Sequence, residues 1–181
     1  MTATTLDPTT ALIMIDLQKG ITAFAADHGV DEVLANSEKL ATAFRERGLL
    51  VVHVNVTGGA PGRTSFSRPP RELPADWAEL VLPVEDGDVT VTKQTWGAFH
   101  GTGLDAALRE RGVTQVVITG VATSMGVEST ARAAHEHGYH VTIASDAVTD
   151  MDPVSHDHSL ARVFPKLGET GTTAELIALL G

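Results

Sequence analysis

The feature that most constrains the fold of this chain is the alternation of short apolar runs with segments of helical periodicity. The apolar runs are rich in valine and isoleucine. Runs of this kind are typical of strands that are buried on both faces of a parallel sheet. We predict five such strands, at 11–15, 49–56, 89–92, 115–121 and 140–145, and a short sixth strand near Glu169.

Helix signals lie between the predicted strands. Residues 31–47 carry apolar side chains at helical spacing, and Gly48 follows them as a helix end. Because strands that alternate with helices form a parallel sheet covered on both faces, we predict a single α/β domain over 1–181. The expected fold is a three-layer, Rossmann-like arrangement with a six-stranded, mainly parallel sheet. The other predicted helices lie at 102–111 and 127–137, and begin at Asp152 and Thr172.

Two of these helix starts have the spacing of a capping box, a threonine followed three positions later by an acidic residue. The pairs are Thr102 with Asp105 and Thr172 with Glu175. We expect both helices to begin at these threonines.

Composition excludes several classes of protein. The 181 residues carry a formal net charge of −10, which would repel the phosphates of nucleic acid. The chain has no cysteine, so disulfides, thiolate metal sites and a cysteine nucleophile are excluded. No apolar run approaches the ~18 residues of a membrane span, and the polar N-terminus lacks the features of a signal peptide. We therefore expect a cytoplasmic protein that binds a small molecule, with no nucleic-acid or membrane partner.

The segment 57–83 interrupts the alternation of strands and helices. It is rich in proline and glycine and shows no sustained periodicity. Long segments of this kind in compact domains are often lids or subunit contacts. Because it carries Phe66 and Trp77, we expect it to lie in a subunit interface, or to act as a lid within one subunit.

Three polar positions follow predicted strands. Asp16 follows the first strand, Lys93 follows the third, and a glycine-containing turn at 122–126 follows the fourth. In open parallel sheets, ligands bind beyond the carboxyl ends of the strands, where the strand order reverses. Each position alone is a weak signal, since aspartates often form turns and lysines are usually solvated. Together they predict an active site with a carboxylate and an amine.

Three segments of the sequence resemble the signature segments of isochorismatase-like hydrolases. They are Asp16-Leu17-Gln18, Lys93 followed by Ala98-Phe99, and the run GVATSMGVESTAR from Gly120 to Arg132. The resemblance extends from about residue 10 to the C-terminus, and the third segment is highly specific. It implies a six-stranded parallel sheet in Rossmann-like order and a hydrolase that acts on a small molecule.

The usual nucleophile of this family is missing from the third segment. In most members a cysteine attacks an amide or similar carbonyl, with the aspartate and the lysine as its acid and base partners. This sequence has Gly126 at the cysteine position, and neither Ser124 nor Ser129 replaces the cysteine by register. The resemblance therefore gives Asp16, Lys93 and Gly126 as the catalytic positions, without covalent acyl chemistry.

True isochorismatases within the family tolerate glycine at this position, because they cleave a vinyl ether without a covalent intermediate. We therefore predict non-covalent hydrolysis of the vinyl-ether type, with Asp16 as general acid and Lys93 as its electrostatic partner. A general acid near pH 7 requires that burial raise the pKa of Asp16. Lys93 would lower that pKa unless it chiefly contacts a substrate carboxylate, and the sequence leaves this point open.

Two alternatives stay open at this stage. The chain could be a non-catalytic, small-molecule-binding descendant of a cysteine hydrolase. It could also be an amide hydrolase whose catalytic cysteine has been replaced at position 126. Isochorismatases read roughly KWRYSAF from the lysine onward, whereas this chain reads KQTWGAF from Lys93, which argues against isochorismate itself as the substrate.

Further site residues are expected from resemblance and position. The resemblance implies that the peptide bond entering Ala122 is cis and that the N–H groups of Ala122 and Gly126 point at the substrate. A turn-capping role competes with substrate binding for Gln18, and core packing competes for the aromatic residues. The expected substrate-binding residues are Gln18, Phe24, Trp96, Phe99 and Ala122.

No metal and no other cofactor are expected. The nicotinamidase branch of the family has an Asp-x-His…His metal site after the second strand, and this chain has no histidine between residues 57 and 99. His156 matches a recurrent family histidine, for which we favour a structural role. The resemblance also implies a homo-oligomer, either a dimer or a tetramer.

Overall fold

The structure is a computed structural model that describes residues 2–65 and 72–181. Its centre is a six-stranded parallel sheet, which confirms the predicted α/β fold class. The strand order is β3-β2-β1-β4-β5-β6, so the direction of winding reverses between β1 and β4. The strands are β1 Thr10–Ile15, β2 Leu50–Val56, β3 Val89–Lys93, β4 Gln115–Val121, β5 His140–Thr149 and β6 Glu169–Gly171.

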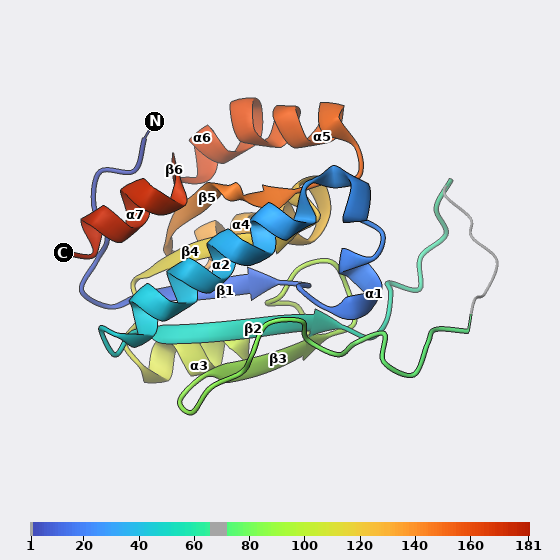
Figure 1. Cartoon of the computed structure of the whole chain (residues 1–181), viewed down its shortest axis with the longest axis horizontal. Coiled ribbons are helices and arrows are strands. Elements are labelled where there is room, and N and C mark those ends of the chain that lie inside the picture. The colour runs from blue at the N-terminus through green and yellow to red at the C-terminus, as the bar shows by residue number, and fades with distance from the viewer. Residues whose placement is uncertain (1, 66–71) are drawn as a thin grey trace.

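Helices cover both faces of the sheet (Figure 1). Helices α2 (Val30–Arg45) and α7 (Thr173–Leu179) lie on one face, whereas α3 (Leu104–Glu110) and α4 (Glu128–Glu136) lie on the other. Among the described residues, no helix is long and apolar enough to cross a membrane. The remaining helices are α1 Lys19–Thr22, α5 Pro153–His158, α6 Phe164–Leu167, the 3₁₀ helix η1 Ala26–His28, and the π-helical turns η2 Thr123–Val127 and η3 Ser159–Val163.

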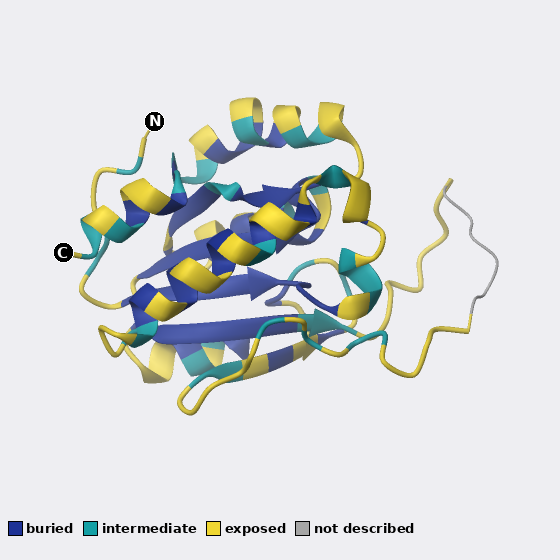
Figure 2. Cartoon of the chain, viewed as in Figure 1, coloured by how far each residue is buried: buried dark blue, intermediate teal, exposed yellow. Residues whose placement is uncertain are grey.

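Alternate residues of β1 pack into two separate hydrophobic cores. Ala11, Ile13 and Ile15 belong to the core on the side of α3 and α4. Leu12 and Met14 point the other way, into the core on the side of α2 and α7. All of β1 is buried, as the dark blue strands in Figure 2 show. A central strand covered on both faces accounts for the uninterrupted apolar run in the sequence.

The capping box predicted at Thr102 and Asp105 is wrong, and α3 begins later, at Leu104. The Thr102 hydroxyl instead donates to the carbonyl of Ala98 at 2.6 Å. The Asp105 carboxylate accepts a hydrogen bond from the Tyr139 hydroxyl at 2.6 Å. The Thr102 hydroxyl also accepts from the N–H of Leu104 at 3.2 Å, but no reciprocal bond between Thr102 and Asp105 forms, which the spacing alone does not reveal.

Strand β5 is longer than predicted and ends at Thr149 rather than at residue 145. Its pairing with β4 has a register irregularity between Ile118 and Gly120, after which pairing resumes at Gly120 and Val148. Such an irregularity inserts extra residues into one strand without ending the ladder. As a consequence, Asp150 rather than Asp146 follows the strand at its carboxyl end.

The capping box at Thr172 and Glu175 is confirmed, because each side chain accepts a hydrogen bond from the backbone N–H of the other residue. Replacing Thr172 with alanine is expected to lower the free energy of unfolding by about 1 kcal/mol, since it removes the N-cap acceptor. The matched control is Glu175→Gln, which keeps an acceptor and should change stability little. Urea denaturation followed by circular dichroism measures both variants. Equal stability of the two variants would contradict the expectation.

Candidate active site

Asp16, Lys93 and Gly126 come together at the carboxyl edge of the sheet. Asp16 directly follows β1, Lys93 is the last residue of β3, and Gly126 lies in η2, the turn that follows β4. The site therefore lies where the strand order reverses, which is the position expected for a ligand site in this architecture.

Lys93 and Asp16 form a buried ion pair. Lys93 Nζ lies 2.7 Å from Asp16 Oδ2, and the two side chains are only 1% and 8% exposed. The ammonium also donates to the carbonyl oxygens of Thr95 at 3.2 Å and Trp96 at 2.8 Å. An ammonium group has three N–H donors, so these contacts use all of them. Lys93 therefore contacts Asp16, and it keeps no donor for a substrate carboxylate.

The surroundings of Asp16 favour its protonated form. Burial raises the pKa of the carboxyl group from 3.8 to about 6, although the charge and hydrogen bond of Lys93 act in the opposite direction. Oδ1 is buried and has no hydrogen-bond partner among the described residues. The backbone φ of Asp16 is 54°, in the left-handed region that aspartate tolerates better than most residues. In the Asp16 carboxyl group, Oδ2 is therefore hydrogen-bonded to Lys93, whereas Oδ1 has no partner among the described residues.

Position 126 faces this carboxyl group. A Cβ atom built on Gly126 would lie 3.1 Å from Asp16 Oδ2 and 3.0 Å from Ile15 Cγ2. A side chain at this position would therefore stand directly beside the acid. The structure thus brings the three predicted catalytic positions into one site, while their catalytic roles stay predictions.

Two side chains that the sequence analysis missed hold the η2 turn in place. Asp150 Oδ2 accepts hydrogen bonds from the backbone N–H and the hydroxyl of Ser124, both at 2.7 Å. Thr130 donates to the carbonyl of Gly126 at 2.7 Å and accepts from the N–H of Ala98 at 3.1 Å. Thr130 therefore ties the turn to the segment after β3. Asp150 could have been identified from its place directly after β5, but the predicted strand ended at residue 145 instead of Thr149.

The chain enters η2 through a cis peptide bond between Val121 and Ala122, as the resemblance implies. The carbonyl of Ala122 accepts hydrogen bonds from the N–H groups of Met125 and Val127, both at 3.1 Å. His156 Nδ1 lies 2.9 Å from the Thr123 hydroxyl oxygen. This contact agrees with the structural role that we favoured for the histidine.

Two of the expected substrate-binding residues serve the fold instead. Gln18 is fully buried, and its amide bonds to the N–H and carbonyl of Val56 and to the carbonyl of Trp77. Phe99 belongs to a hydrophobic core and stacks on His137, with the ring centroids 5.0 Å apart. Because both side chains are already engaged by the protein, we leave them out of the proposed site.

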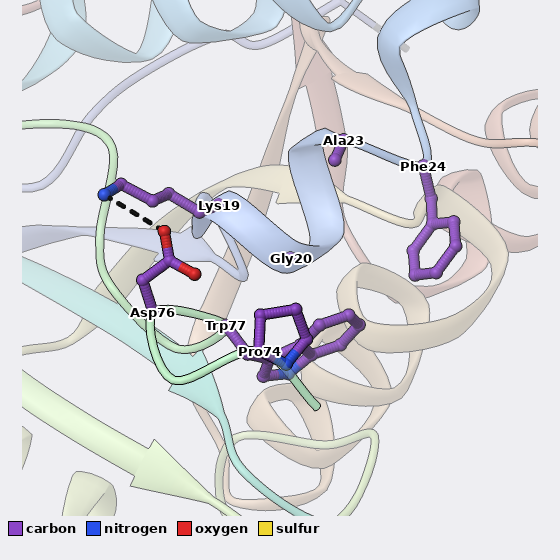
Figure 3. A pocket seen from close by; sticks show the side chains of 7 residues that line it. All are labelled: Lys19, Gly20, Ala23, Phe24, Pro74, Asp76 and Trp77. Atoms are coloured by element: carbon purple, nitrogen blue, oxygen red, sulfur yellow. Dashed lines mark ion pairs between the residues drawn. The ribbon is translucent and has the colours of Figure 1, made fainter. Parts of the chain in front are cut away.

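Phe24 lines a hollow of about 330 Å³ beside α1 (Figure 3). The indole of Trp77 lies so close to Gly20 that a Cβ there would be 2.1 Å from the ring. Phe24 meets the same indole edge-on, with the centroids 5.8 Å apart. The hollow is lined by Lys19, Gly20, Ala23, Phe24, Pro74, Asp76 and Trp77.

Part of the segment 57–83 packs against α1 of the same chain. The backbone N–H groups of Lys19 and Gly20 donate to the carbonyls of Glu79 and Trp77. Lys19 Nζ also pairs with Asp76 at 3.4 Å, the contact dashed in Figure 3. This packing fixes part of the segment within one subunit, and the lid interpretation stays a prediction. Phe66 lies outside the described residues, and the predicted subunit contact stays a prediction.

Apolar side chains are exposed next to the catalytic positions in the sequence. Trp96, three residues after Lys93, is 58% exposed, and Met125, which precedes Gly126, is 40% exposed. Trp96 is therefore accessible to a ligand, and its role in substrate binding stays a prediction. Within residues 2–65 and 72–181, no group of three or more histidine, aspartate or glutamate side chains is placed to hold a metal ion.

The fold and the buried acid–amine pair at the reversal point of the sheet define an α/β protein with a candidate active site at that edge. The comparison with known families then identifies it: the chain belongs to the isochorismatase family, because the isochorismatase domain matches residues 10–175. It is therefore a hydrolase of this family that acts on a small molecule.

Individual relatives agree with this assignment. The chain is 41% identical to an uncharacterized isochorismatase family protein of Bacillus subtilis, over 93% of this chain and 92% of that protein. It is also similar to the structure of an isochorismatase family protein from Burkholderia thailandensis, with 40% identity, a TM-score of 0.89 and 97% coverage of both chains. A third similar structure is N-carbamoylsarcosine amidase from Thermoplasma acidophilum, with 26% identity, a TM-score of 0.74, and coverage of 91% of this chain and 96% of that one.

Proposed function

We propose that this hydrolase cleaves its substrate without a covalent intermediate, with Asp16 as the general acid. The observation that carries the proposal is the unequal environment of the two carboxyl oxygens of Asp16. Oδ2 is held by Lys93 at 2.7 Å, whereas Oδ1 is buried with no partner among the described residues. A carboxyl group in this environment can present its proton to a bound substrate from the free oxygen. The chain has no cysteine that could attack instead.

Hydrolysis of a vinyl ether is the reaction that best fits this acid. Asp16 transfers its proton to the terminal carbon of the C=C–O group, which leaves a positive charge shared between the other carbon and the ether oxygen. Water adds to that carbon and returns a proton to Asp16, and the resulting hemiketal or hemiacetal separates into a carbonyl compound and an alcohol. In this cycle Lys93 holds Asp16 in place, and its charge stabilises the carboxylate that exists between the two proton transfers.

A second candidate is direct attack of water on an amide. The similarity to N-carbamoylsarcosine amidase favours it, because that protein is named as an amidase. In such a reaction the ionised Asp16 would take a proton from the attacking water, so catalysis would need the carboxylate rather than the acid.

The pH dependence of turnover tests the proposal. Suitable substrates are 3,4-dihydro-2H-pyran and isochorismate as vinyl ethers, and nicotinamide and maleamate as amides. If Asp16 is a general acid, kcat should be highest below a pKa of about 6 and should fall about tenfold for each pH unit above it. A rise in kcat as the pH increases through the same value would identify the amide reaction instead. Turnover of an amide with no turnover of either vinyl ether would contradict the proposal.

A further inference from the structure

A cluster of charged side chains lies just before β3, at the opposite end of this strand from Lys93. Its centre is the carboxylate of Asp88, whose side chain is only 3% exposed. Arg45 donates to both oxygens of this carboxylate, from Nε to Oδ1 at 3.2 Å and from Nη2 to Oδ2 at 2.6 Å. His53 Nε2 lies 3.1 Å from Oδ2, and the backbone N–H of Glu85 donates to the same oxygen at 2.9 Å. These contacts join α2, β2 and the segment that leads into β3.

The contact between Arg45 and Asp88 is a charge-assisted one. Burial by itself would raise the pKa of the Asp88 carboxyl group, but the hydrogen bonds of the cluster, those from Arg45 first, hold this pKa below its ordinary value. Asp88 is therefore ionised at neutral pH, and the guanidinium binds it in the bidentate manner. Arg45 also donates to the carbonyl of Pro83 at 3.2 Å and to the carboxylate of Glu85 at 3.0 Å. The last turn of α2 thus holds the chain at three points just before β3 begins.

The place of Lys93 depends on the register of β3. This edge strand pairs with β2, and the ladder ends at the pair of Val56 and Lys93. The connection between the two strands, residues 57–88, has no helix or strand among its described residues, so it does not set the register as a tight turn would. A slip of one residue would turn the Lys93 side chain to the other face of the sheet, and a slip of two would move it about 7 Å along the strand. Either slip would break the 2.7 Å contact between Lys93 Nζ and Asp16 Oδ2.

We infer that Asp88 is a positioning residue, which fixes the register of β3 and so holds Lys93 beside Asp16. Asp88 lies five residues before Lys93, about 16 Å along an extended strand, so it acts through β3 and not by contact. The inference rests on the proposed function in one respect, since it takes Lys93 as the partner of the catalytic acid. A residue that only stabilised the fold would leave the contact between Lys93 and Asp16 intact in every folded molecule.

The pKa of Asp16, measured on the whole protein by carbon-13 NMR of the carboxyl group, tests the inference. Burial raises this pKa to about 6 in the wild type, and Lys93 keeps it from rising further. In Asp88→Asn, which keeps the shape but removes the charge, Lys93 loses its fixed place and the pKa of Asp16 should rise by about one unit or more. The matched control is Glu85→Gln, which also removes a charge that pairs with Arg45. Because the Glu85 side chain is 57% exposed, this variant should keep the wild-type pKa of Asp16.

A second variant covers the case in which Asp88→Asn does not fold. The double variant Asp88→Asn with Arg45→Gln removes both charges of the central pair, so neither is left buried alone, and the same rise is expected in it. The inference is overturned if the pKa of Asp16 does not rise in the folded variant, or if Glu85→Gln raises it equally. Because the titration needs no substrate, a failure of the proposed reaction and a failure of this inference are seen separately.

Discussion

Asp16→Asn should lower kcat/KM for the substrate at least about a hundredfold, within the range of 10² to 10⁴ that a general acid contributes. Asparagine has nearly the same shape as aspartate but has no proton to donate at this pH. The control is Asp27→Asn, an exposed position in η1 that changes the net charge equally. Steady-state kinetics at pH 6 measure the effect, because the pKa of Asp16 is about 6 and much of the wild-type acid is protonated there. A variant that keeps more than a tenth of wild-type activity would contradict the role of Asp16.

The same substitution threatens the fold, because it leaves the Lys93 ammonium buried without an opposite charge. Breaking a buried pair in this way typically costs about 3–5 kcal/mol. The double variant Asp16→Asn with Lys93→Met removes both charges and should recover most of the lost stability. Loss of activity in this folded double variant would show that catalysis, and not folding, depends on the pair.

The place of the candidate site could be predicted from the sequence because each of its three positions follows a predicted strand. The run 11–15 ends at Asp16, and parallel pairing places every such strand end at the same edge of the sheet. Sheet geometry alone then brings Lys93 to Asp16, although the two residues are 77 positions apart in the sequence.

The sequence did not reveal which polar and aromatic side chains line the site and which make structural contacts elsewhere. Gln18 matches a position near the substrate, yet its amide is taken up by Val56, which is 38 residues away. Phe99 follows the lysine motif, yet its ring stacks on His137. Such partners depend on where distant segments pack, and neither periodicity nor motif spacing carries that information. The partners of Lys93 were undecided for the same reason.

Gly126→Cys should give this protein amide hydrolase activity that the wild type lacks or shows only weakly. The Cβ would lie 3.1 Å from Asp16 Oδ2, so the attached thiol would stand beside a carboxylate that can take its proton. Gly126 is not among the residues with positive φ, so its backbone can accept a side chain. The contact of 3.0 Å with Ile15 Cγ2 requires a small shift, and we expect a loss of about 1–3 kcal/mol in stability.

Ammonia release from nicotinamide and maleamate, together with an acyl-enzyme adduct seen by mass spectrometry, would show the acquired reaction. Ser129→Cys is the matched control, since it introduces the same thiol about one helical turn further along and should form no adduct. Gly126→Ala separates the effect of filling the space from the effect of the sulfur. A folded Gly126→Cys protein with neither ammonia release nor adduct would mean that Asp16 and Lys93 are not arranged to activate a nucleophile at this position. That result would weaken the interpretation of the chain as an amide hydrolase that has lost its cysteine. It would not bear on the general-acid role of Asp16, which the Asp16→Asn variant tests separately.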